Sequence, residues 1–579
     1  MKINEVEKLT GLTKKAIRLY ESRGLLDVSR ASNTYREYGE EHVKILKLIR
    51  LFRTAGISLF DIKLWREGVV TSAELAKKRK AEIENENIAN LEQLKLCEEL
   101  ALLSDIGGSF DFSTPFDEND RQESAEITEN SRLAVGIDIG TTTISAAVVD
   151  LDAKKTVQTF NLPGGAFIKT PLSSAKEQDA KEILQKSKKL LDSILDTYKG
   201  IRAIGVTGQM HGVIYCDKDG HAVSELATWQ DGRADEIFED GRSYCDEIFR
   251  LTGKRVSAGY GLATHFYNMK NSLVPKGATS VCTVMDYVIM ALCGLDRPIM
   301  HTTNAHSFGL FDIEANGFDR ESVRALGIDE SLLPRVTADT AVVGEYRDIP
   351  VSVAIGDNQA SVFGAVKDEE SSALANYGTG SQISCVSSTP KSTAHMECRP
   401  YIGGKFLLCG SALAGGRAYA MLERFFRAYM AEATGEDKNR YEEVNRIAKR
   451  AFGKVKPLDI CTKFSGERGA PDLRGSISGI SEENFTPAAV TLGFLYGMAR
   501  ELCDMYAELE GEHRAKLVTS GNVARKNPVF TDVLADVFGM EVSLTAGKEE
   551  AASGAALFAL LAANLAKNQS EVKACIVTP

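Results

Sequence analysis

Residues 104–131 divide this chain of 579 residues into two parts with different sequence patterns. The segment is acidic, rich in Ser and Gly, and without hydrophobic periodicity, which is typical of a linker. Before it, apolar residues recur at helical spacing, and after it short apolar runs alternate with amphipathic stretches. The length also exceeds that of one ordinary domain. We therefore expect a multidomain protein with a small helical N-terminal part and a large α/β body.

Charge is divided unevenly between these parts. Residues 1–66 hold 14 Lys and Arg against 8 Asp and Glu, whereas the whole chain has a net charge of −11. A small basic part on an acidic body suggests that the basic part binds a polyanion such as DNA. A solvated basic surface gives the same balance, so charge alone leaves both interpretations open.

Composition excludes several classes of protein. Hydrophobic residues make up 44% and charged residues 26%, which are globular proportions and exclude collagen-like and wholly disordered chains. The eleven cysteines include no CxxC pair, which indicates a reducing compartment, and His and Cys show no zinc-ligand spacing. No secretory signal and no apolar run of membrane-spanning length is present. We expect a soluble, cytoplasmic protein with no membrane partner.

The N-terminal residues predict a series of short helices. A first helical pattern ends at Gly11, and Thr13 is placed to cap a second helix over 14–21. Two helices joined by a short turn with Gly are the signature of helix-turn-helix DNA-binding domains. Further helices are predicted over 42–55 and 59–66.

The order of these motifs resembles the DNA-binding domain of MerR-type transcriptional regulators. The resemblance rests on INEVEKLTGLTKKAIRLYESRGLL, then NTYREY, then IRLFRTAGISLFDIK. It implies a winged helix-turn-helix domain over 1–70, whose second helix enters the major groove of DNA and whose wing holds the phosphate backbone. The residues that it places against DNA are Lys15, Arg18 and Tyr20 of the helix and Tyr35 and Arg36 of the wing.

A long polar helix is expected over 71–103. Its apolar residues have helical spacing but no clean heptad, so the pattern alone supports a coiled coil only weakly. The MerR resemblance implies an antiparallel dimerisation helix here, and hence a homodimer, which suits the usual two half-sites of DNA. A helix packed on the following domain is the alternative.

From residue 132 onward, β-type apolar runs alternate with amphipathic helices, as in α/β proteins. Strands are expected over 133–140, 144–149, 201–206 and 351–355, with a helix over 183–195. The body is therefore predicted to contain at least one sheet covered by helices.

Two turns in this body have the chemistry of phosphate sites. Asp138 stands at a strand end before a turn of Gly and Thr, and residues 376–381 repeat this pattern about 240 residues later. Backbone N–H groups of such turns cradle phosphates, and a carboxylate beside them can hold Mg²⁺. Two such turns suggest two related halves that close on one nucleotide.

Asp357 follows an apolar strand in the sequence GDNQAS. A carboxylate at a strand end can act as general base on a substrate hydroxyl. On local sequence alone, the N-cap of a helix explains the same residue equally well.

Six motifs in fixed order resemble the FGGY-type carbohydrate kinases: DIGTTT, GQMHG, TWQDGR, GDNQAS, YGTGS and SGNVARKNPVF. The resemblance implies two actin-like (ribonuclease-H-like) lobes with ATP in the cleft. The N-terminal lobe would span 132–366 and hold sugar and phosphate, and the C-terminal lobe 367–579 would hold the nucleotide. GQMHG and TWQDGR are more similar to ketose kinases, xylulokinase and especially sedoheptulokinase, than to glycerol kinase.

The same resemblance assigns roles to single residues. Asp357 would be the catalytic base, and Asp138 would hold Mg²⁺. The sugar would be lined by Gln209, Met210, His211, Trp229, Asp231 and Asn358, and phosphate and nucleotide by Gly140, Thr141, Thr142, Gly378, Thr379, Gly380, Gly415, Gly416, Gly521 and Asn522. The family usually has two glycines where Gly521 and Asn522 stand.

Two functions agree with these motifs. The first is a sugar-responsive DNA-binding transcriptional regulator fused to an ATP-dependent ketose kinase that phosphorylates a sugar hydroxyl. The second is a transcriptional regulator whose kinase-like body only senses sugar or nucleotide without turnover. Every part that phosphoryl transfer needs is present, but an intact site serves binding as well as turnover, so the sequence does not separate the two. The first, with both functions in one chain, is the one we expect.

Overall fold

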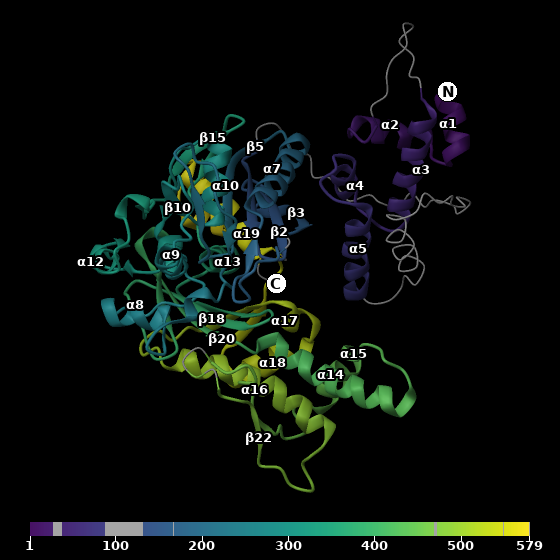
Figure 1. Ribbon diagram of the computed structural model, residues 1–579. Helices are drawn as coiled ribbons and strands as arrows, with labels where there is room; N and C mark the ends of the chain where they lie inside the picture. Colours follow the sequence, from purple (N-terminus) through teal and green to yellow (C-terminus); the bar gives the residue numbers. More distant parts are fainter. Residues whose placement is uncertain are drawn as a thin grey trace. The chain divides into compact units, whose positions relative to one another are not determined.

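The computed structural model describes residues 1–26, 38–86, 131–165, 167–467, 470, 472–547 and 549–577 (Figure 1). The chain divides into two compact units. One comprises Met1–Ile127 with Lys188–Tyr198, and the other comprises Thr128–Ser187 with Lys199–Pro579. The first contains the helical N-terminal part and the second contains nearly all of the α/β body.

The N-terminal part is helical, as predicted. Its helices are α1 (Ile3–Thr10), α2 (Lys14–Ser22), α3 (Glu40–Thr54), α4 (Leu59–Arg66) and α5 (Ser72–Glu86). The Thr13 side chain caps α2 by accepting a hydrogen bond from the backbone N–H of Ala16 at 3.2 Å. Phe52 of α3 packs edge-on against Trp65 of α4, with ring centroids 4.9 Å apart.

Some predictions for this part fall on residues outside those that the structure describes. They are the wing residues Tyr35 and Arg36, residues 87–103 of the expected dimerisation helix, and residues 104–130 of the linker.

The body contains two large sheets of similar topology. The first has the strand order β15-β16-β5-β1-β2-β3 and the second has the order β19-β20-β18-β17-β23-β24. In the first sheet, β1 and β2 form an antiparallel hairpin, and β1 also pairs in parallel with β5. In the second sheet, β17 and β18 form the equivalent hairpin, and β17 also pairs in parallel with β23. The repeated arrangement agrees with the expected two related halves.

The strands of the first sheet are β1 (Leu133–Ile139), β2 (Thr143–Asp150), β3 (Lys155–Pro163), β5 (Ile201–Gly208), β15 (Val342–Tyr346) and β16 (Ile349–Ser352). Those of the second are β17 (Ser372–Tyr377), β18 (Ser381–Ser387), β19 (Glu397–Pro400), β20 (Phe406–Ala412), β23 (Lys516–Ser520) and β24 (Glu541–Leu544). The expected strand over 351–355 therefore begins and ends earlier, as β16.

Shorter strands and further helices complete the described chain. The short strands are β4 (Glu177–Gln178), β6 (Ile214–Cys216), β7 (Leu226–Ala227), β8 (Ile237–Glu239), β9 (Arg242–Ser243), β10 (Ser280–Cys282), β11 (Ile299–His301), β12 (Phe311–Asp312), β13 (Gly317–Phe318), β14 (Arg335–Thr337), β21 (Asp459–Cys461) and β22 (Ser476–Ser478). The helices are α7 (Ala180–Thr197), α8 (Tyr244–Thr252), α9 (Gly261–Lys270), α10 (Val284–Cys293), α11 (Thr302–Phe308), α12 (Arg320–Ala325), α13 (Asp357–Ala365), α14 (Gly415–Thr434), α15 (Tyr441–Ala451), α16 (Pro487–Ala507), α17 (Asn522–Lys526), α18 (Pro528–Phe538), α19 (Glu550–Ala562) and α20 (Gln569–Lys573).

Helix α19 packs against β1, β5 and α13 (Figure 1). Small residues allow this close approach, because a Cβ at Gly136 of β1 would overlap the carbonyl oxygen of Ala552, and one at Gly554 would overlap that of Ala360. The mostly apolar residues 551–562 thus form a helix that is buried inside the body. Across the part of the chain that the structure describes, none of the helices has the length and apolar character needed to cross a membrane.

This packing differs from the simple division of the body at residue 366. By sequence α19 falls in the expected C-terminal lobe, yet it lies on the first sheet. One core cluster therefore contains residues from both sides of that boundary, among them Ala134, Ile355 and Leu557. The reason is that Gly136 of β1 has no side chain, so the apolar helix α19 can pack directly against the backbone of the first sheet at that position.

A buried ion pair ties α20 to the same region. The Lys573 ammonium lies 2.7 Å from a Glu369 carboxylate oxygen and donates hydrogen bonds to the carbonyl oxygens of Phe363, at 2.9 Å, and Val366, at 2.8 Å. Both charged side chains are 7% exposed. Burial lowers the pKa of Lys573 to about 8, although the Glu369 charge acts in the opposite direction.

We expect Lys573→Met to lower the free energy of unfolding of the body by about 3–5 kcal/mol, because Glu369 loses its nearest counter-charge while it remains buried. Calorimetric unfolding of the full chain measures the loss. The double variant Lys573→Met/Glu369→Gln should lose less than the single variant, since it leaves no buried charge; Lys405, which lies 3.6 Å from Glu369, is partly exposed to solvent. A double variant that is less stable than the single one would contradict this account of the pair.

Candidate active site

A cavity of about 350 Å³ lies between the two sheets of the body. Its lining comes from strand ends, helix starts and the faces of strands in both halves. The residues are Asp138, Met210, His211, Trp229, Asp357, Asn358, Ser361, Leu374, Asn376, Gln382, Ser384, Arg399 and Ala551. Asp357, the predicted base, and Asp138, the predicted Mg²⁺ ligand, are therefore in one cavity.

Asp357 is the first residue of α13, directly after the N-cap residue Gly356. Its carboxylate lines the cavity and accepts a hydrogen bond from the backbone N–H of Asn358 at 2.6 Å. Burial raises the pKa of Asp357 to about 6, although this N–H and the Arg399 charge act in the opposite direction. The Asp357 side chain is not the N-cap of α13, and a carboxylate with this pKa is suited to accept a proton near neutral pH.

Asp138 stands near the end of β1 and faces the same cavity. Burial, and then the charges of Asp357 and Glu549, raise the pKa of Asp138 to about 8. Asp138 and Asp357 line the cavity and carry the hard oxygen donors that Mg²⁺ prefers, whereas Glu549 is not among the lining residues. The chemistry of Asp138 therefore fits a ligand of a divalent cation, although in the described part of the chain these carboxylates do not form a cluster of three within ligand distance.

His211 has a left-handed backbone, with φ of 78°, and its ring is fixed on two sides. Nδ1 lies 2.8 Å from the carbonyl oxygen of Ser307 in α11, and the ring stacks on Tyr260 with centroids 4.6 Å apart. Because a carbonyl oxygen only accepts, the Nδ1 nitrogen carries the proton. Met210 beside it is 3% exposed and also lines the cavity.

Trp229, Thr141 and Gln209 form a chain of hydrogen bonds. The Trp229 indole N–H donates to the Thr141 hydroxyl at 2.9 Å, which donates to the Gln209 side-chain oxygen at 3.2 Å. Gln209 in turn donates to Gln178 at 2.9 Å. Trp229 reaches the cavity, whereas Gln209 is 5% exposed and lies behind it, where it orients Thr141.

Asp231 does not line the cavity, contrary to the prediction. Its carboxylate forms two hydrogen bonds with the Arg233 guanidinium, each at 2.8 Å, and accepts from the backbone N–H of Lys176 at 2.9 Å. Asp231 is 1% exposed. The ion pair with Arg233 holds the Asp231 side chain in the interior, so its role here is structural.

The residues predicted for phosphate and nucleotide lie at two turns and two helix starts. Gly140, Thr141 and Thr142 follow β1, and Gly378, Thr379 and Gly380 form the equivalent turn between β17 and β18. Gly415 and Gly416 begin α14, and the Gly416 N–H donates to the carbonyl oxygen of Gly378 at 2.9 Å. The second turn and the start of α14 are therefore in contact.

Gly521 and Asn522 stand at the start of α17. Gly521 has φ of 93°, and a Cβ there would overlap the carbonyl of Tyr377 at the end of β17. This position therefore requires Gly, whereas Asn522 is an ordinary first helical residue.

The second half of the body supplies three polar cavity residues that the sequence motifs did not reveal. They are Gln382, Ser384 and Arg399, whereas Asn376 begins the turn over 376–381 that the sequence predicts as a phosphate site. Gln382 and Ser384 alternate along β18, so they share one face of the strand. The alternation of polar residues in an otherwise buried strand could have indicated that Gln382 and Ser384 face a site. No sequence pattern indicated Arg399, because a lone Arg in a short strand has no characteristic spacing.

Helix α2 places the residues predicted to contact DNA on different faces. Lys15 and Arg18, three residues apart, are both exposed. Tyr20 is 3% exposed, and it follows the buried Ile17 by three residues on the same inner face of the helix. The prediction that Tyr20 faces DNA therefore disagrees with the structure, because helical periodicity turns it into the domain core.

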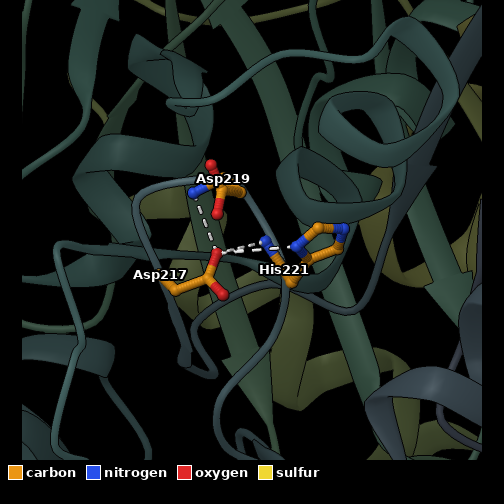
Figure 2. Close-up of side chains that lie close together, drawn as sticks. All are labelled: Asp217, Asp219 and His221. Carbon is orange, nitrogen blue, oxygen red and sulfur yellow. Dashed lines mark hydrogen bonds and ion pairs between the residues drawn. The ribbon is translucent and has the colours of Figure 1, made fainter.

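Asp217, Asp219 and His221 form a second group of polar residues (Figure 2). None of the three lines the cavity. The Asp217 carboxylate accepts hydrogen bonds from the backbone N–H groups of Asp219, at 3.0 Å, and His221, at 2.9 Å. Asp219 and His221 are exposed, and this pattern is that of an Asx turn. The group is explained by turn geometry.

Comparison with known families assigns the N-terminal part and most of the body. Residues 133–375 match the N-terminal domain of the FGGY family of carbohydrate kinases, and residues 373–563 match its C-terminal domain. Residues 1–68 match the MerR HTH family of regulatory proteins.

Individual relatives agree with these matches. Mouse (Mus musculus) sedoheptulokinase is 28% identical over 477 residues, which cover 74% of this chain and 97% of that protein. Glycerol kinase of Enterococcus casseliflavus is 25% identical over 475 residues, covering 76% of this chain and 90% of that protein. The xylulose kinase structure from Lactobacillus acidophilus has a TM-score of 0.67 at 20% identity, covering 77% of this chain and 93% of its own, which shows the shared fold.

The two tryptophans of the chain, Trp65 and Trp229, allow a direct test of this cavity. We expect saturating ketose with ATP and Mg²⁺ to change the fluorescence of Trp65→Phe, in which Trp229 is the remaining emitter, because Trp229 lines the cavity. Trp229→Phe, with binding verified by calorimetry, should show no change. A ligand-dependent change that persists in Trp229→Phe and vanishes in Trp65→Phe would place the binding site elsewhere.

Proposed function

Because the chain belongs to the FGGY family of carbohydrate kinases and carries a MerR-type helix-turn-helix domain, we propose that it is a sugar-responsive transcriptional regulator that also phosphorylates a ketose. The single observation that carries the kinase reaction is the position of Asp357. Its carboxylate faces a cavity of about 350 Å³ together with His211 and Asp138. The sedoheptulokinase and xylulose kinase likeness favours a seven- or five-carbon ketose as substrate.

In the proposed reaction, Asp357 accepts the proton of the sugar hydroxyl as its oxygen forms a bond to the γ-phosphorus of ATP. The bond from that phosphorus to the leaving oxygen breaks, and ADP departs. When bound, Mg²⁺ would be held by Asp138 and would offset negative charge on the phosphates. The residues of the chain mainly position the two substrates, as is usual in phosphoryl transfer.

The remaining residues divide between the two substrates. On the sugar side, Met210, His211, Trp229 and Asn358 line the cavity. Around the phosphates, the turns at 140–142 and 378–380 offer backbone N–H groups, and the starts of α14 and α17 complete the nucleotide side.

For the regulatory part, we propose that Lys15 and Arg18 contact DNA from α2, with Tyr35 and Arg36 as wing contacts. Phosphate contacts of Lys and Arg make affinity depend on salt. We further propose a homodimer through the segment 71–103, which the sequence predicts as a dimerisation helix, since two-fold DNA sites suit a dimer. We also propose a cytoplasmic location.

The catalytic assignment predicts the behaviour of one variant. Asp357→Asn should bind ketose and ATP but turn over about 10²–10⁴ times more slowly, because the amide cannot accept the hydroxyl proton. A coupled assay for ADP, with circular dichroism to verify folding, measures this. Near-normal turnover in the folded variant would refute the role of Asp357. Ketose binding without any turnover in the unaltered protein would instead favour a regulator that only senses its ligand.

The proposed link between the two functions predicts reciprocal effects. Saturating ketose and nucleotide should change the affinity for a palindromic DNA site, and that DNA should change ketose affinity by the same factor. Titration of labelled DNA at fixed salt, with and without ligands, measures the first effect. Arg18→Ala should weaken DNA binding and retain kinase turnover. Identical DNA affinity and identical transcription with and without ligands would show two independent functions.

A further inference from the structure

Arg399 is the one cationic side chain among the residues that line the described cavity. It stands on β19, at the edge of the second sheet, and its side chain is 6% exposed. Glu397 lies two residues earlier on the same face of the strand. The Arg399 guanidinium therefore reaches the cavity from the half that contains the second sheet, whereas His211 belongs to the other half.

The hydrogen bonds of Arg399 leave one nitrogen available. Nε and Nη2 both donate to the same Glu397 carboxylate oxygen, at 3.2 Å and 2.8 Å. Within the described part of the chain, Nη1 has no acceptor. A buried guanidinium with an unpaired nitrogen on a cavity wall is expected to find its acceptor in a ligand.

Other contacts place Arg399 near the predicted sugar residues. Strand β19 packs against α11, whose residue Ser307 holds the His211 ring through its carbonyl oxygen at 2.8 Å. Burial lowers the pKa of His306 in α11 to about 4, and the charge of Arg399 acts in the same direction. Arg399 is thus within electrostatic range of the helix that orients His211.

We propose that Arg399 is a specificity residue whose Nη1 donates a hydrogen bond to an uncharged oxygen of the sugar, a hydroxyl or the ketose carbonyl. The inference rests on the proposed kinase function and extends it to the second wall of the cavity. On that wall, Arg399 supplies a donor, and the sugar bridges the two halves of the body.

Neighbouring groups favour an uncharged sugar over a sugar acid. Glu397 already neutralises Arg399 and occupies Nε and Nη2, so the paired, two-pronged contact that a carboxylate prefers is not available. Asp357 adds an acidic group to the same cavity. A substrate carboxylate would therefore meet repulsion and a single N–H donor.

Asn358 offers a complementary acceptor. Its amide nitrogen donates to the Gln382 side-chain oxygen, and its own oxygen is buried without a hydrogen-bond partner in the described chain. A sugar hydroxyl can donate to this oxygen while another sugar oxygen accepts from Arg399. A site with both a donor and an acceptor rejects sugars that lack the matching groups.

The test compares Arg399→Met with Arg320→Met in the full chain, because Arg320 is exposed and lies outside the cavity. Calorimetry with sedoheptulose, xylulose, gluconate and ATP gives the dissociation constants, and the coupled assay gives KM and kcat. We expect Arg399→Met to raise the dissociation constant and KM of the preferred ketose roughly tenfold to a hundredfold, and those of ATP by less than about twofold. Arg320→Met should match the unaltered protein.

Arg399→Lys gives a second variant that keeps the charge and reduces the risk of misfolding. It should recover only part of the ketose affinity, because an ammonium that pairs with Glu397 does not also reach the sugar. Three results would each overturn the inference. The first is an unchanged ketose affinity in Arg399→Met, and the second is a loss of affinity in that variant for ATP alone. The third is a preference of the unaltered protein for gluconate that Arg399→Met abolishes. Failure of the kinase proposal can be distinguished from failure of this inference. It would appear as an absence of turnover in the unaltered protein, whereas the ketose dissociation constants of the variants would still test the role of Arg399.

Discussion

The close packing of α19 on β1, β5 and α13 sets the relative position of the two acidic residues of the cavity. At Gly136 and Gly554 the helix approaches neighbouring backbone so closely that no side chain fits between them. Asp138 lies near the end of β1 and Asp357 at the start of α13, and α19 holds both elements at once. The separation of the two carboxylates is therefore fixed by backbone contacts, which deform less readily than side-chain contacts.

The repeated sheet topology explains why the chemistry is divided between two halves. Each sheet presents one turn, at 140–142 or 378–380, at the same point of its hairpin. Each half also presents side chains to the cavity from its own elements, with His211 and Asp357 on one side and Gln382 and Arg399 on the other. A ligand that contacts both sides gains its full set of hydrogen bonds only when the halves are at one particular separation.

The sequence alone predicted the two parts of the chain, the α/β body and most of the cavity residues that come from ordered motifs. Asp138, His211, Asp357 and Asn358 of these motifs all line one cavity, because Asp138 lies near the end of β1 and the other three follow β5 or β16 of the same sheet. Their chemical roles stay predictions. Asp231 and Tyr20 were misplaced because their environment depends on Arg233 and on the inner face of α2, which motif likeness does not report. The position of α19 on the first sheet was not predictable, since chain order assigns it to the second half.

These features bear on how a sugar could influence a regulator. A ligand changes an equilibrium only in proportion to the difference between its affinities for the two states. Contacts confined to one half of the body would be equal in an open and a closed cavity and would shift nothing. Donors and acceptors on opposite walls, such as Arg399 and His211, are satisfied together in one arrangement only, so a bound sugar would stabilise that arrangement. The second wall therefore matters for regulation as well as for specificity, because it is what makes sugar binding sensitive to the separation of the halves.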